Sequence, residues 1–152
     1  LILVPQFSLY GDKAMGTTAL ADVKSIQSMA IAYNMDSTTP LKIDTLAPLV
    51  GMTLPTGKKT ATDASGSKAI QYDDAAGVVT YYYRRGDVTL QCKLTLSAQT
   101  MIWDTTLTDG KRQDALAQGL KIAGTKDSGK TPISTAGTLG QLGKAAITWP
   151  TT

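Results

Sequence analysis

The sequence predicts an α+β fold in which a long N-terminal amphipathic α-helix packs on an antiparallel β-sheet. Helical periodicity in residues 1–34 predicts the helix. Strict alternation of apolar and polar residues from Val88 to Leu96 predicts a half-buried strand. At 152 residues the chain has the length of one domain. We therefore predict a single domain, in which a connecting αβ-loop (35–68) joins the helix to a sheet and C-terminal region (69–152).

The N-terminal helix is predicted from apolar residues at steps of three and four, which share one face: Leu20, Val23, Ile26, Ala30 and Tyr33. If the helix begins at Pro5, the missing N–H of this residue costs little, whereas in a helix that continues upstream Pro5 would cause a kink. Gly11 and Gly16 each cost about 1 kcal/mol relative to Ala. The first half of the helix is therefore predicted to be the weaker half, unless a neighbour packs closely on those glycines. Turn-forming residues at 36–40 end the helix.

The sheet is predicted mainly from residues 69–96. A run of β-forming residues at 77–84 precedes the alternating strand, and Arg85-Gly86-Asp87 between them predicts a tight hairpin. Residues 69–73 predict a third strand. In the triplet Tyr81-Tyr82-Tyr83, strand geometry points neighbouring rings to opposite faces, so at least one ring is predicted to face the core.

The connecting segments give weaker patterns. Residues 43–50 predict a short helical turn with Asp44 as its N-cap and Gly51 as its end. Residues 55–68 predict a polar, mobile loop.

The C-terminal third is predicted to hold one helix and one strand. The helix is expected over 109–121, although Gly110 and Gly119 weaken it. Residues 124–144 predict mostly loop, and residues 145–149 a last strand.

Composition excludes much enzyme chemistry. The chain has no histidine, which removes Ser-His-Asp and Cys-His catalysis, His-ligated zinc and haem on a proximal His. Cys92 is the single cysteine, and its place on the apolar face of its strand predicts a buried structural thiol. With 15 basic and 12 acidic residues, the net charge of +3 does not demand a nucleic acid partner. We expect no enzyme activity and no cofactor.

Three motifs leave alternatives open. Residues 124–131 match the phosphate-loop pattern, with Lys130 on the phosphates and Thr131 on magnesium, but Pro132 follows where a helix should open. A P-loop nucleotide hydrolase is thus the weakest alternative. A calcium site in the C-terminal region is possible, with these aspartates as candidate ligands: Asp104, Asp109, Asp114 and Asp127. A further alternative is a protein that binds DNA or host surfaces through two basic pairs, Lys58-Lys59 and Arg84-Arg85.

The stretch from Ile2 to Tyr10, Ile-Leu-Val-Pro-Gln-Phe-Ser-Leu-Tyr, resembles the N-terminal helix of type IV pilins and pseudopilins. The similarity continues through Lys13-Ala14, Asp22-Val23-Lys24 and Ala32-Tyr33 to Asp36 and Pro40, and covers about a third of the chain. It implies a pilin-like fold in an N-terminally truncated, soluble form, whose native chain carries a processed, N-methylated apolar helix half before Leu1.

The resemblance further implies a structural subunit of a type IV pilus filament, at the bacterial surface and in the inner membrane before assembly. Its partners would be further copies of the subunit and the inner-membrane assembly machinery, with no nucleic acid. The assembly residues would be Pro5, Phe7, Tyr10, Gly11, Gly16, Leu20, Val23, Ile26 and Tyr33. Pro5, Gly11 and Gly16 would permit a bend or a close helix–helix approach in the fibre.

Two points set this chain apart from many pilins. Many pilins close a C-terminal loop with two cysteines, whereas this chain has only Cys92. Packing or an ion must therefore hold that loop here. Residues 97–152 resemble no pilin region. The alternatives within the family are a periplasmic pseudopilin of a type II secretion system and a minor pilin that binds DNA or a host surface.

Overall fold

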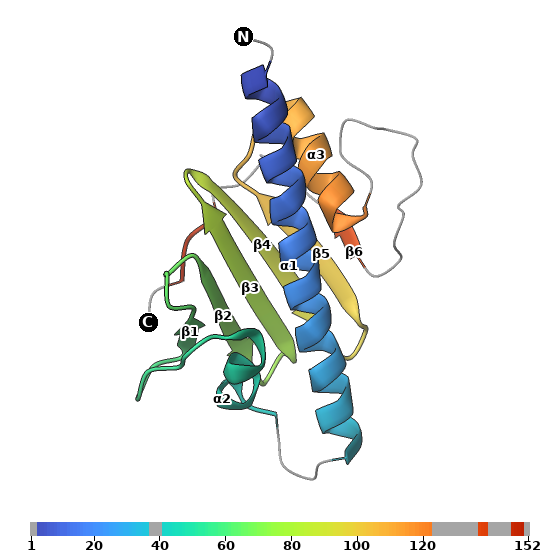
Figure 1. Cartoon of the computed structure of the whole chain (residues 1–152). Coiled ribbons are helices and arrows are strands. Elements are labelled where there is room, and N and C mark those ends of the chain that lie inside the picture. Colours follow the sequence, from blue (N-terminus) through green and yellow to red (C-terminus); the bar gives the residue numbers. More distant parts are fainter. Residues whose placement is uncertain (1–2, 37–40, 123–136, 140–146, 151–152) are drawn as a thin grey trace.

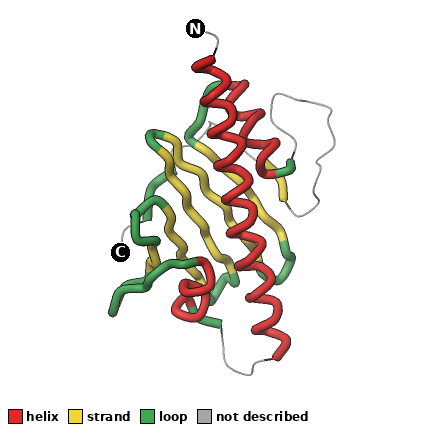
Figure 2. The backbone as a smooth tube through the Cα atoms, viewed as in Figure 1, coloured by secondary structure: helices red, strands yellow, loops and turns green. Residues whose placement is uncertain are grey.

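A computed structural model of the chain describes residues 3–36, 41–122, 137–139 and 147–150, with the side chains of the first segment from Leu9 to Tyr33. Its elements in chain order are α1 (Leu3–Asp36), α2 (Ile43–Leu46), the 3₁₀ turn η1 (Ala47–Val50), β1 (Thr60–Thr62), β2 (Lys68–Asp73), β3 (Val78–Arg85), β4 (Val88–Thr95), β5 (Thr100–Thr105), α3 (Gly110–Leu120) and β6 (Gly137–Leu139). Figures 1 and 2 show α1 lying diagonally across one face of the sheet, with α3 beside its N-terminal half.

The described strands form one sheet in sequence order, β1 to β6. Neighbours from β1 to β5 are antiparallel, and β6 joins β5 in parallel. The α+β prediction, with a long N-terminal helix on an antiparallel sheet, is confirmed. The sheet is wider than predicted, because β1, β5 and β6 extend it beyond residues 69–96.

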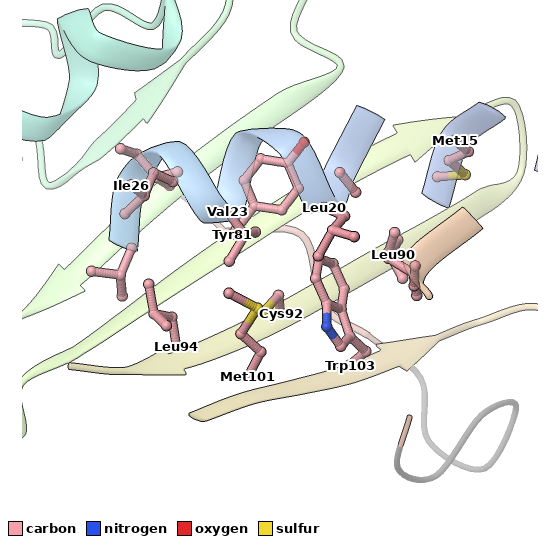
Figure 3. Close-up of a cluster of buried hydrophobic side chains, with 14 of the residues drawn as sticks. Met15, Leu20, Val23, Ile26, Tyr81, Leu90, Cys92, Leu94, Met101 and Trp103 are labelled. Atoms are coloured by element: carbon pink, nitrogen blue, oxygen red, sulfur yellow. The ribbon is translucent and has the colours of Figure 1, made fainter. Parts of the chain in front are cut away.

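The core lies between α1 and the sheet. Cross-strand register places Ile70, Tyr81, Cys92 and Trp103 in one row over four adjacent strands. Figure 3 shows side chains of α1, Val23 among them, pointing at this layer. Cys92 is fully buried, and burial raises the pKa of its thiol, which confirms the predicted structural cysteine.

The turns of the central strands follow the sequence prediction. Gly86-Asp87 joins β3 to β4 as a two-residue hairpin, and Gly86 takes the positive φ of +60° that a hairpin turn requires at this point. Tyr81 lies beneath α1, whereas Tyr82 is on the opposite face of the sheet. The prediction that at least one ring of this triplet faces the core is confirmed.

Some local predictions are wrong. The polar loop predicted for 55–68 contains β1, and Asp44 lies within the first turn of α2, because Lys42 occupies the N-cap position. Of the strand predicted for 145–149, residues 147–149 are described and are not in a strand. Instead β6 forms within 124–144, because the exposed edge of β5 is available for pairing.

The predicted helix over 109–121 is confirmed as α3. Asp109 caps it, since one of its carboxylate oxygens accepts from the backbone N–H groups of Lys111 at 3.0 Å and Arg112 at 3.1 Å. Its end at Lys121 adopts the left-handed conformation with φ +59°.

Candidate functional site

The resemblance directs attention to α1, whose two faces have different surroundings. The predicted apolar stripe faces the sheet: Val23, Ile26 and Ala30 are fully buried, Leu20 is 6% exposed, and Tyr33 packs against the core from its edge. This part of the prediction is confirmed. These side chains are packed inside the domain, so their surfaces are not free to contact another chain.

Gly16 brings α1 into backbone contact with α3. A Cβ at Gly16 would lie 2.5 Å from the carbonyl oxygen of Leu116, and a Cβ at Gly119 would overlap the carbonyl oxygen of Lys13. The two glycines therefore let the helices approach more closely than any side chain allows. The close packing on Gly16 that the sequence requires for a stable first half of the helix is thus provided within the chain by α3; the helix approach predicted in a fibre remains a prediction.

Asp12 of α1 contacts both α3 and the end of β3. Its side chain is fully buried and receives Arg112 Nε at 2.7 Å and Arg112 Nη2 at 3.0 Å. Arg85 Nη1, from the end of β3, lies 3.7 Å from the same carboxylate. The Arg85 guanidinium occupies the space that a Cβ at position 11 would fill, so Gly11 makes room for it. The hydrogen bond to Asp12 raises the pKa of Arg112, so its guanidinium stays charged.

A second polar contact fixes α1 farther along the chain. Tyr81 donates its phenolic O–H to Asp22 Oδ2 at 2.6 Å, and Lys68 Nζ lies 2.9 Å from the same oxygen. Asp22 thus connects α1 to both β2 and β3. Sequence reasoning missed Asp12 and Asp22, because nothing in the helical pattern distinguishes a buried aspartate from a solvated one.

The outward face of α1 is exposed and consists mainly of small or cationic side chains: Tyr10, Lys13, Ala14, Thr17, Ala21, Lys24, Ser25, Ser28, Met29 and Ala32. Thr17 and Ser25 donate their hydroxyls to carbonyl oxygens four residues earlier, each at 3.0 Å. Their hydrogen-bonding needs are therefore partly met by the helix itself. Tyr10 is 69% exposed.

Shallow depressions border this outward face. One, of about 420 Å³, lies between the Lys24–Met29 segment of α1 and Leu49 of η1. Another, of about 200 Å³, lies between Tyr10 and Lys13 of α1 and the outer surface of α3.

The predicted assembly residues therefore fall into four groups. Gly16, Leu20, Val23, Ile26 and Tyr33 face the interior of the subunit, Gly11 lies under Arg85, and Tyr10 is exposed. Pro5 and Phe7 lie within α1, but their side chains are outside the described residues. Apart from Tyr10, the exposed positions on the outward face of the helix were not selected by sequence reasoning.

The other sequence motifs are not brought into one site. Arg84 contacts Trp149 on one side of the sheet, whereas Arg85 contacts α1 on the other. Lys58 and Lys59 line a cleft with Tyr72, at the opposite end of the β2–β3 hairpin from both arginines. The phosphate-loop match at 124–131 and Asp127 lie outside the described residues.

Among the residues that the structure describes, no group of three or more acidic or cysteine side chains could hold a metal ion. Within the same residues, no helix combines the length and the apolar character needed to cross a membrane. Comparison of the chain with known protein families, curated proteins and solved structures gave no match.

Proposed function

We propose that this chain is the structural subunit of a type IV pilus filament, which assembles through α1. The observation that carries the proposal is the disposition of α1: one face is fixed on the sheet, and the opposite face is exposed from Tyr10 to Ala32. This exposed stretch is about 33 Å long at the rise of an α-helix. The part of the pilin-like sequence from Leu3 to Tyr33 lies along the same helix.

The chemistry of the exposed face suits packing against another helix. Its alanines and hydroxyl residues are small, which allows close helix–helix approach. Because Thr17 and Ser25 already donate to their own helix, burying them leaves no unpaired hydroxyl donor. Lys13 and Lys24 have long apolar stems that can lie along a partner while their ammonium groups remain in water.

The contacts beneath α1 give such packing a mechanical consequence. Asp12 joins the helix to α3 and the β3–β4 hairpin, and Asp22 joins it to β2 and β3. A partner that binds the outward face of α1 therefore positions the whole subunit, and not a loosely attached helix.

The first test is mass spectrometry of the native protein from a fraction sheared off the cell surface. We expect an N-methylated N-terminus and an apolar segment before Leu1 of about 20 residues, the length of a membrane span. The same N-terminus in the cell envelope but not in the sheared fraction would indicate a pseudopilin. A native chain that starts at Met shortly before Leu1 would contradict both assignments.

Cysteine accessibility tests the role of the helix face directly. Ser25→Cys places a thiol on the outward face of α1, and Lys93→Cys places one on the exposed outer face of β4. Cys92 is fully buried and should not react. We expect maleimide to label both variants in dispersed subunits, but only Lys93→Cys in intact filaments. Equal labelling of Ser25→Cys in both states would exclude α1 as the contact.

A further inference from the structure

Residues near the C-terminus lie on the face of the sheet that points away from α1. Tyr82 and Arg84 are two residues apart on β3, so both project from this outer face. The Trp149 ring lies 6.0 Å from the Tyr82 ring, centroid to centroid, at an interplanar angle of 56°. The Arg84 guanidinium carbon lies 4.0 Å from the centroid of the Trp149 ring.

Both partners of Trp149 are fixed by the sheet. Arg84 donates from Nε to the carbonyl oxygen of Gly66 at 3.1 Å, which orients its guanidinium. Tyr82 lies in β3, which is paired with both β2 and β4, and it is 8% exposed with Trp149 in place. Trp149 therefore meets a preformed surface, and its cation–π contact is well within the usual limit of about 6 Å.

The attachment of residues 147–150 differs from that of the strands. No backbone hydrogen bond joins these four residues to another described residue, so the contacts seen are side-chain contacts. β3, in contrast, is paired along its length with both β2 and β4. A segment held by few contacts opens at a lower free-energy cost than a paired central strand.

We propose that residues 147–150 form a strap that opens and closes on the outer face of the sheet, with Trp149 as its clasp on Tyr82 and Arg84. Opening uncovers Tyr82 while α1, α3 and the sheet stay folded. The strap is thus a conformational device built into the fold. It does not depend on the pilus assignment, since it involves only contacts within one subunit.

The two tryptophans of the chain allow a direct test. Trp103→Phe leaves Trp149 as the reporter of the strap, and Trp149→Phe leaves the fully buried Trp103 as the reporter of the core. Trp103 Nε1 has no hydrogen-bond partner among the described residues, so Phe removes no hydrogen bond there. In Trp103→Phe we expect the Trp149 emission to change at lower urea than the circular dichroism of the same protein. Coincident transitions would overturn the proposal.

A second variant separates the clasp from general stability. In the Trp103→Phe background, Arg84→Gln should raise the open population, measured by acrylamide quenching of Trp149, about two- to fivefold because the cation–π contact is lost. Lys93→Gln is the matched control, since it removes an exposed cation from the outer face of the adjacent strand. Equal quenching in the two variants would show that Arg84 does not hold the strap.

Discussion

The two halves of α1 are docked by different physical means. Besides the buried Met15, residues 9–19 contact α3 and the β3–β4 hairpin through the backbone at Gly16 and through the ion pairs of the buried Asp12 carboxylate. Residues 20–33 meet the sheet through the apolar side chains of the predicted stripe. The sequence predicts the first half to be weak unless a neighbour packs closely on its glycines, and α3 is that neighbour.

The two halves of α1 therefore have different roles: one supplies docking free energy, and the other fixes the position of α3. Apolar burial is non-directional and supplies most of the docking free energy, so the second half needs only a stripe of suitable volume. Close glycine contacts and a bidentate Arg–carboxylate pair allow very few relative positions, so the first half specifies where α3 sits. A buried ion pair adds little net stability but is costly to break.

The largest expected effect is in the apolar half. Ile26→Ala removes a fully buried side chain over the sheet and should reduce the free energy of unfolding by about 4 kcal/mol, because it leaves a cavity. Met29→Ala, on the outward face of the same helix, should change it by less than about 1 kcal/mol. Urea unfolding followed by circular dichroism measures both. Similar losses in the two variants would mean that α1 is not docked by this stripe.

A smaller loss is expected at the helix crossing. The added methyl of Gly119→Ala would meet the backbone of Lys13 and Thr17, which cannot rotate away, and should cost about 3 kcal/mol despite the better helix propensity. In Gly11→Ala the nearest atoms to the added methyl belong to the guanidinium of Arg85, the end of a flexible side chain that can move aside. The free energy of unfolding should therefore change by less than about 1 kcal/mol. If Gly119→Ala is as stable as Gly11→Ala, α1 and α3 are not in backbone contact.

The ion pairs of Asp12 give the third effect. Among the described residues, Arg112→Met leaves the fully buried carboxylate with Arg85, at 3.7 Å, as its ion-pair partner. It should cost about 2 kcal/mol, less than a fully buried pair because Arg112 is 31% exposed. Arg85→Met removes the more distant and more exposed partner and should cost less than half as much. The two variants are compared by urea unfolding. A larger loss in Arg85→Met would assign the main contact to the hairpin.

These two halves also mark how far the sequence could predict the fold. The stripe of Leu20, Val23 and Ile26 was predictable, because periodicity reports which face of a helix is buried. The partner of Gly16 was not, since a glycine in a helix shows only that something approaches closely, and Gly119 is a hundred residues away in the chain. Gly119 counted as evidence against α3, although it is the residue that lets α3 dock.

The candidate site was less predictable than the fold for a related reason. Sequence resemblance selected the apolar and glycine positions of α1, most of which face the subunit interior. The outward face consists mainly of alanine, serine, threonine and lysine, whose positions carry no distinctive pattern until the buried face is known. Asp12 and Asp22 became identifiable only when tertiary structure placed Arg112, Tyr81 and Lys68 beside them.

The smallest effect at neutral pH tests the polar contact in the apolar half. Tyr81→Phe removes the O–H donated to Asp22 and should cost about 1 kcal/mol at pH 8, because Lys68 still pairs with the carboxylate. Tyr10→Phe is the control, since Tyr10 is 69% exposed. Urea unfolding at fixed pH measures both variants against the wild type.

Alkaline pH should then reverse the difference. Burial first, and the hydrogen bond to Asp22 next, raise the pKa of Tyr81 well above its ordinary value of 10.0. Above pH 10 the unfolded chain releases this proton while the folded protein retains it, so the wild type loses about 1.4 kcal/mol per pH unit that Tyr81→Phe does not lose. At this slope the advantage of about 1 kcal/mol is lost between about pH 10.5 and 11, and at higher pH we expect Tyr81→Phe to be the more stable protein. An advantage that stays constant from pH 8 to 11 would mean that the phenol is not held neutral between α1 and the sheet.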